Sequence, residues 1–254
     1  MARIPMGKSY NLGIPKETFL ESIRTALGRT KGPPDTSRTN LKQTKEELEE
    51  LASYVESSAS TNRDALSSNL AQTAKLRGWN VHIAHNNEDV LDYISTVANT
   101  WNTTTLSRSD QPVFADCPID NGLIELGYNI TTINHNGNND ARSLLRENII
   151  ASGIGITGAD YAVAETGSIV LMPRVGISRL VSLVPPVHIA LVRKKDILNS
   201  IDDVFLLRRL DHYNNGDMGS YLNFITGPSR TADIEQTIVV GVHGPKEAHM
   251  VLLD

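Results

Sequence analysis

Apolar residues recur every three or four positions through the first third of the chain, which is the spacing of an amphipathic helix. Three helices are predicted there, and the last ends at Gly78. The first follows Pro15, the second covers about residues 41–55, and the third covers about residues 62–76. The stretch 30–40 (TKGPPDTSRTN) has the Gly, Pro and Ser content of a linker. We therefore expect an N-terminal helical region over residues 1–78.

Beyond Gly78, apolar runs of strand length alternate with amphipathic segments of helix length. The runs 168–172 (SIVLM) and 187–193 (VHIALVR) are almost continuously apolar, as strands buried on both faces are. Further strands are expected at 81–84, 112–116, 129–134, 223–226, 237–242 and 248–253, and helices at 88–101, 140–150 and 195–210. This alternation predicts an α/β core over residues 79–254 with a mainly parallel sheet.

Composition and charge exclude several classes of protein. The 254 residues carry a formal net charge of −5, which argues against a nucleic-acid binder. The single Cys117 excludes an internal disulfide, a cysteine-ligated iron–sulfur cluster and an all-cysteine zinc site within one chain. The start shows no export signal, and no apolar stretch approaches the roughly 20 residues that span a bilayer. We expect a cytoplasmic protein without a membrane span.

Residues 153–158 (GIGITG) match the G-x-G-x-x-G pattern of dinucleotide-binding loops. That pattern needs a strand before it and an acidic residue about 20 positions further on. The preceding ARSLLRENII is typical of a helix, and no Asp or Glu lies between Glu165 and Asp196. We interpret these glycines as a tight turn where the backbone passes close to another element.

Glu165, in GITGADYAVAETG (155–167), stands at the entrance of the predicted strand 168–172. Ligand sites of open α/β folds gather at such strand ends. The carboxylate is either a reactive group or a cap for neighbouring backbone N–H groups.

Two further polar clusters follow later in the chain. In TGPSRTADIE (226–235), Ser229 or Thr231 could cap a helix whose N–H groups face an anion, and Arg230 adds a bidentate donor. The alternative is an N-cap beside a solvated arginine. In GVHGP (241–245), His243 either faces a cleft or belongs to a structural turn. The histidines match no metal-ligand spacing, so no metal site is predicted.

The strings GITGADYAVAETGSIVLMP, LVPPVHIALVR, FITGPSRTADIE and GVHGPKEAHMVLLD together resemble the LUD-domain family, whose best-known members are the lactate-utilisation proteins C. The resemblance covers about residues 150–254. It implies an open sheet with helices on both faces, of the sugar-phosphate-isomerase/CoA-transferase type. It also implies a part in oxidising L-lactate to pyruvate beside iron–sulfur partner proteins.

Two functions follow from the resemblance. The first is a non-redox accessory component of lactate oxidation that binds no cofactor itself and binds either a small anion or a partner protein. The second is a stand-alone enzyme that uses Glu165 on an activated acyl or phosphorylated molecule, since Glu165-Thr166-Gly167 is similar in placement to the nucleophile string of CoA-transferases. In both, the loops are expected to converge at one sheet edge. The expected ligand-binding residues are Thr157, Gly158, Asp160, Thr166, Gly167, Thr226, Gly227, Ser229, Arg230, Thr231, His243 and Gly244.

Overall fold

The computed structural model describes residues 15–28, 43–133, 139–216, 219, 221–232 and 238–254. It divides into two compact units, Met1–Thr44 and Lys45–Asp254. The first contains one described helix, α1 (Lys16–Ala26), whose Phe19 and Ile23 are exposed. The predicted linker at 30–40 lies outside the described residues.

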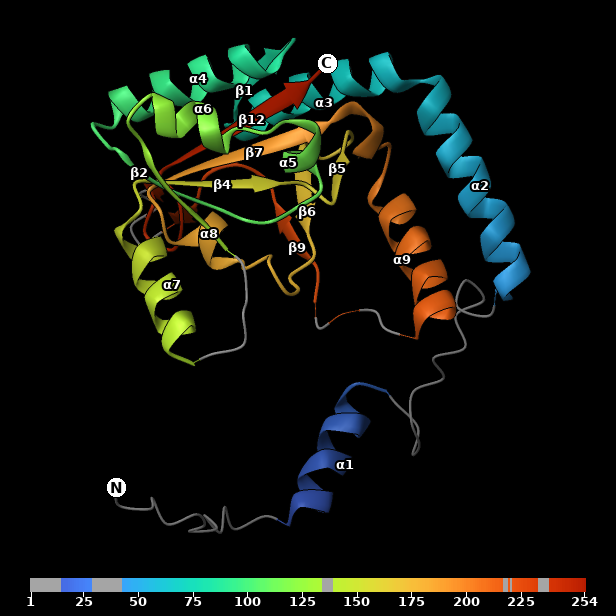
Figure 1. Ribbon diagram of the computed structural model, residues 1–254. Helices are drawn as coiled ribbons and strands as arrows, with labels where there is room; N and C mark the ends of the chain where they lie inside the picture. The colour runs from blue at the N-terminus through green and yellow to red at the C-terminus, as the bar shows by residue number, and fades with distance from the viewer. Residues whose placement is uncertain (1–14, 29–42, 134–138, 217–218, 220, 233–237) are drawn as a thin grey trace. The chain divides into compact units, whose positions relative to one another are not determined.

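The second unit is built on a six-stranded sheet in the order β1-β12-β7-β4-β2-β3 (Figure 1). Every neighbouring pair in it is parallel. Its strands are β1 (Asn80–Ala84), β2 (Thr105–Arg108), β3 (Asn129–Thr132), β4 (Ile154–Gly158), β7 (Val187–Arg193) and β12 (Glu247–Leu253). The predicted α/β class with a mainly parallel sheet is confirmed.

Helices cover both faces of this sheet, because its central strands are apolar on both sides. Ile189 and Leu191 belong to the core beneath α4, while Ala190 and Val192 belong to the core beneath α3. The helices α7 and α8 lie across the sheet from α4 and α6 (Figure 1). These helices are α3 (Arg63–Arg77), α4 (Asn87–Thr100), α6 (Asp120–Glu125), α7 (Asn139–Ala151) and α8 (Leu180–Leu183).

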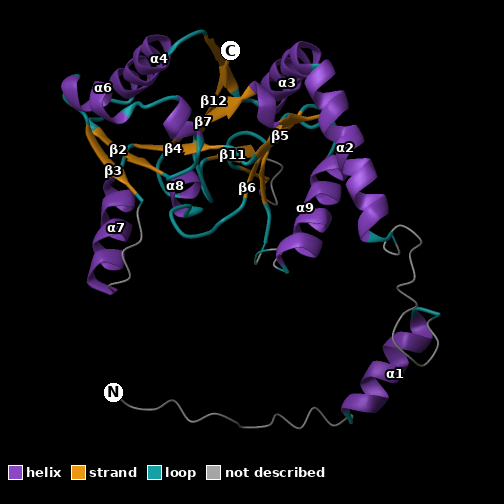
Figure 2. Ribbon diagram, turned by 45° about the vertical axis from the view of Figure 1, so that its right-hand side comes forward, coloured by secondary structure: helices purple, strands orange, loops and turns teal. Residues whose placement is uncertain are grey.

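Two smaller sheets complete the unit. The first has the order β8-β5-β6-β9, and the second is the hairpin β10-β11. Helices α2 and α9 pack side by side (Figure 2). The remaining bounds are α2 (Lys45–Thr61), β5 (Tyr161–Val163), β6 (Ser168–Leu171), β8 (Ile197–Leu198), α9 (Ile201–Asn215), β9 (Asn223–Ile225), β10 (Arg230–Ala232) and β11 (Ile238–Val240).

Three sequence-based assignments differ from the structure. Residues 112–116, predicted as a strand, form helix α5 (Val113–Asp116), which starts after Pro112. The GIGITG segment is not a turn: it forms the fully buried strand β4, and its glycines allow close packing. A side chain at Gly155 would overlap the carbonyl oxygen of Val181. The helix predicted from 195 begins only at Ile201, where Ser200 and Asp203 form a capping box.

Helices α2 and α3 pack within the same unit as the sheet, so the structural division falls at 44/45, earlier than residue 78. Within the described part of the chain, no helix combines the length and apolar character needed to cross a membrane.

Candidate functional site

The order of the strands places a topological switch point between β2 and β4. From β2 the chain steps outward to β3, then returns to β4 on the other side of β2. In open α/β sheets, ligands bind in the crevice outside the carboxyl ends of the strands at such a point. The residues after Arg108 and Gly158 therefore mark the place to look for a site.

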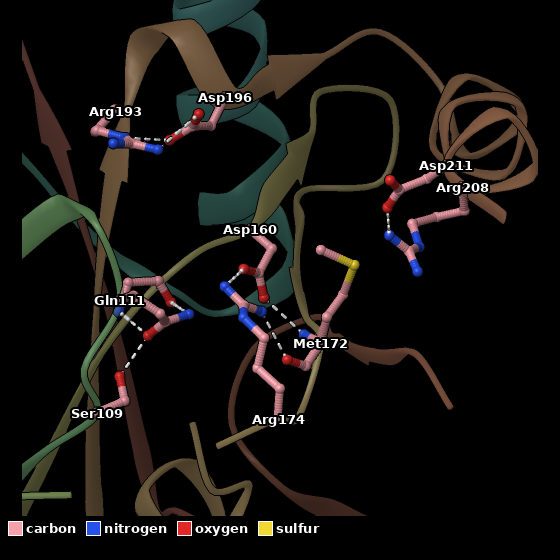
Figure 3. A network of polar contacts seen from close by, with 10 residues as sticks. Ser109, Gln111, Asp160, Met172, Arg174, Arg193, Asp196, Arg208 and Asp211 are labelled. Carbon is pink, nitrogen blue, oxygen red and sulfur yellow. Dashed lines mark hydrogen bonds and ion pairs between the residues drawn. The ribbon is translucent and has the colours of Figure 1, made fainter. Parts of the chain in front are cut away.

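A buried glutamine closes the innermost part of this crevice. The side-chain oxygen of Gln111 accepts hydrogen bonds from the Ser109 hydroxyl and from the backbone N–H of Gly158, the latter at 2.6 Å (Figure 3). Its amide nitrogen donates to the Gly158 carbonyl at 3.1 Å. Because Gln111 uses both backbone groups of Gly158, the end of β4 is fixed in position against the segment that follows β2.

Asp160 holds the chain segment that follows β6. Its carboxylate accepts the backbone N–H of Met172 at 2.6 Å and the Arg174 guanidinium at 2.8 Å (Figure 3). The Asp160 side chain is only 5% exposed, whereas that of Arg174 is 44% exposed. This ion pair therefore anchors the start of the loop 173–179.

The loop 173–179 folds over the ends of β2 and β3. The backbone N–H of Asp110 donates to the Gly176 carbonyl at 2.9 Å. Gly176 has φ +81°, and a side chain there would come within 3.3 Å of the Asp110 Cβ. Glycine is therefore favoured at this position by both conformation and space.

A cavity of about 730 Å³ opens between this loop, α7 and α8. Tyr221 and apolar side chains, among them Ile133, Leu145, Ile149 and Ile177, form part of its wall. Four arginines also line it: Arg142, Arg146, Arg174 and Arg179. No Asp or Glu is among the described residues of its lining. The cavity is therefore suited to an anion.

The four arginines have different surroundings. Arg174 is paired with Asp160, and the Arg179 guanidinium lies over the Tyr221 ring at 5.3 Å from its centroid. Arg142 and Arg146 come from the exposed side of α7. A ligand could meet guanidinium groups from α7 and from the loop at once.

A second cavity of about 430 Å³ lies at the carboxyl ends of β1, β7 and β12. Three of the four Lys and Arg side chains in its lining have carboxylate partners: Lys194 pairs with Asp64 and Asp254, and Arg193 and Lys195 pair with Asp116, at 2.9 and 3.5 Å. The hydrogen bonds to Asp254 and Asp64 raise the pKa of the Lys194 ammonium. This internal compensation makes the second cavity the weaker candidate for an anion.

Cys117 lines that second cavity and is buried. Burial raises the pKa of its thiol to about 11, so it stays protonated near neutral pH. Among the described residues, no group of His, Cys, Asp and Glu side chains could hold a metal ion.

The structure distributes the sequence-predicted site residues over three places. At the switch point, Gly158 and Asp160 make the contacts given above. Thr157 points into the core, where its hydroxyl lies 2.8 Å from Nε2 of the fully buried His188. Burial lowers the pKa of His188 from 6.5 to about 3, so the imidazole is neutral.

The second place is the C-terminal end of α3, near Arg77 and Gly78. The hydroxyls of Ser168 and Thr226 are 2.7 Å apart, and Ser229 donates its N–H to the Pro245 carbonyl. The residues that meet around this helix end are Gly167, Thr226, Gly227, Ser229, Arg230 and Gly244. Thr231 lies in strand β10 beside them, so neither Ser229 nor Thr231 caps a helix as the sequence suggested, and the exposed His243 precedes Gly244. Residues 233–235 of this cluster lie outside the described residues.

The third place is the N-terminus of α9. The exposed Glu165 accepts the backbone N–H of Ile201, the first residue of that helix, at 2.7 Å. The neighbouring Thr166 hydroxyl is buried and has no hydrogen-bond partner among the described residues. Glu165 therefore has a capping contact, and its catalytic role stays a prediction, as do the ligand contacts of the other residues.

Sequence reasoning did not find the arginine-lined cavity. Each arginine, read alone, is typical of a solvated surface. The available signal was the spacing of Arg142 and Arg146, which places both side chains on one face of a helix. Arg174, Arg179 and Tyr221 join them only through the folding of distant segments.

Comparison with known proteins gives three results. A model of the LUD domain family matches residues 68–253. A relative from Halalkalibacterium halodurans named "Lactate utilization protein C" is 42% identical over 101 residues, covering 40% of this chain and 44% of the relative. A relative of the same name from Bacillus subtilis is 40% identical over 102 residues, covering 40% and 42%. The matches thus span less than half the length of these relatives.

A crystal structure of a DUF162 family protein from Deinococcus radiodurans superposes with a TM-score of 0.50 at 18% identity. The superposition covers 76% of this chain and 98% of the other. At this identity the likeness concerns the fold alone.

Proposed function

Because the chain belongs to the LUD domain family, we propose that it serves lactate utilisation as an accessory component that binds an anionic ligand. The role in lactate utilisation is carried over from the relatives named for it. The ligand site is the cavity between α7, α8 and the loop 173–179.

The observation that carries this proposal is the set of four arginines around a cavity whose loop, 173–179, is hydrogen-bonded to the segment that follows β2. Planar guanidinium groups bind carboxylate and phosphate oxygens in pairs of parallel hydrogen bonds. Two carboxylates next to the lining, Asp160 and Asp110, are paired with Arg174 and Arg108.

Partner proteins carry the redox chemistry in this proposal. The chain has one cysteine, whereas a cubane or two-iron cluster takes several cysteine ligands. The chain would therefore act beside iron–sulfur proteins and not transfer electrons itself.

A growth assay tests the role of the cavity. In a strain lacking this protein, the Arg142→Gln/Arg146→Gln variant should restore growth on L-lactate poorly, while growth on glucose stays normal. The matched control is Lys45→Gln/Lys75→Gln, which removes two charges from exposed positions of α2 and α3. Full growth with the arginine variant, at normal protein level, would contradict the proposal.

Purification tests the partners. A tagged chain isolated from lactate-grown cells should carry iron and acid-labile sulfide in proteins that separate from it at high salt. Lactate-dependent dye reduction by the isolated chain would contradict the non-redox role.

A further inference from the structure

The charge of the arginine-lined cavity exceeds what a single carboxylate can neutralise. Of its four arginines, Arg174 is paired with a carboxylate, that of Asp160. In the described part of the chain, Arg142, Arg146 and Arg179 have no ion pair with Asp or Glu. A bound monoanion such as lactate would leave about two of these positive charges uncompensated.

Two of the free guanidinium groups act from one helix face. Arg142 and Arg146 are four residues apart on α7, so their side chains are neighbours. Like charges at this spacing repel one another, and an anion with several oxygens relieves the repulsion. A diphosphate offers such oxygens to both planar groups at once.

Tyr221 and Arg179, in the same lining, offer flat surfaces. The half-exposed Tyr221 ring lies beneath the Arg179 guanidinium, at 5.3 Å from the ring centroid. Aromatic rings and guanidinium planes both stack on the rings of nucleobases. Ile133, Leu145 and Ile177 supply apolar contacts to the rest of the cavity.

The volume agrees with a ligand larger than a three-carbon acid. At about 730 Å³, the cavity lies inside the range of roughly 300–1,000 Å³ typical of pockets for drug-sized ligands. Lactate would leave most of this space to water.

We propose that the cavity binds a nucleoside diphosphate, with the phosphates on Arg142 and Arg146 and the base against Tyr221 and Arg179. This inference rests on the proposed function only in taking the cavity as the ligand site. It assigns the site a ligand that carries about three negative charges and an aromatic ring.

Isothermal titration calorimetry of the full chain with ADP, pyrophosphate and L-lactate tests this ligand class. ADP should bind more tightly than pyrophosphate, and pyrophosphate more tightly than lactate. Arg142→Gln/Arg146→Gln should weaken ADP by about tenfold or more, because charge-assisted hydrogen bonds are lost. Tyr221→Ala should weaken the binding of ADP but leave the affinity for pyrophosphate unchanged. The Lys45→Gln/Lys75→Gln control should bind like the wild type.

The outcomes separate this inference from the proposed function. Binding of lactate but not of ADP or pyrophosphate would overturn the diphosphate class and leave the proposed function standing. ADP binding that survives Arg142→Gln/Arg146→Gln would overturn the assigned site. Loss of ADP binding in that variant with full growth on lactate would support the ligand class and refute the cavity's role in lactate utilisation.

Discussion

Substitution of Glu165 distinguishes a structural carboxylate from a reactive one. Its Oε1, on the turn between β5 and β6, accepts the Ile201 N–H at 2.7 Å, and β5 pairs in the same small sheet with β8, the strand that precedes α9. The capping box of Ser200 and Asp203 does not use that N–H: Ser200 accepts from Asp203, and Asp203 accepts from Ser200. Glu165 is therefore the side chain that satisfies the first donor of α9.

The expected cost follows from what each variant keeps. Glu165→Gln retains an acceptor oxygen and loses a negative charge at a helix N-terminus, which is worth about 0.3–1 kcal/mol at an exposed site. Glu165→Ala also loses the hydrogen bond, and the loss of a capping contact costs about 1 kcal/mol, with a range of roughly 0.5–2. We expect the free energy of unfolding to fall in the order wild type, Gln, Ala.

Urea unfolding followed by the fluorescence of Trp79 and Trp101 measures these differences. The matched control is Glu56→Gln, an exposed carboxylate within α2, which should change stability by less than about 0.5 kcal/mol. Unchanged stability in both Glu165 variants would refute the capping role. If such a stable Glu165→Gln protein also failed to support growth on lactate, the catalytic alternative would be favoured.

Three further predictions concern the core around the site. The pKa of His188 is about 3 in the folded protein and 6.5 in the unfolded chain, so the unfolded state binds more protons between these values and stability falls as the pH drops through that range. Between pH 7.5 and 5 the wild type should therefore lose about 2 kcal/mol more than His188→Gln in the free energy of unfolding. Parallel curves of stability against pH for the two proteins would contradict this. Gly155→Ala places a methyl group on the Val181 carbonyl and should cost about 3 kcal/mol or prevent folding, measured by urea midpoint and soluble yield. Asp160→Asn should cost about 1–3 kcal/mol in the same urea assay because its ion pair with Arg174 is lost, and an unchanged midpoint would show that the pair does not anchor the loop.

The sequence by itself determined the elements whose local pattern and burial agree. The apolar runs of β7 and β12 are long enough to define central strands, and α4 and α7 have the spacing of amphipathic helices. Gly78 ends α3 in the left-handed conformation, as a glycine after a periodic segment suggests. In these segments the physical signal is carried by neighbours along the chain.

Other elements depended on neighbours that are distant in sequence. β4 contains two glycines and looked like a turn, yet it lies fully buried in the sheet. Glycine is needed there because the carbonyl of Val181 and the side chain of Val113 occupy the space of a Cβ. Local propensity opposes a strand at this position, and tertiary packing overrides it.

The candidate site shows the same division. The motifs around Asp160 and Glu165 were visible in the sequence, but their hydrogen bonds to Arg174 and Ile201 were not. The arginine-lined cavity combines side chains from α7, the loop 173–179 and residue 221, segments that no spacing rule connects. An arginine alone in water is satisfied by solvent, so it gives no signal of its own. Only the folding of these segments around one apolar wall brings the arginines close together, and it is this concentration of positive charge that favours an anionic ligand.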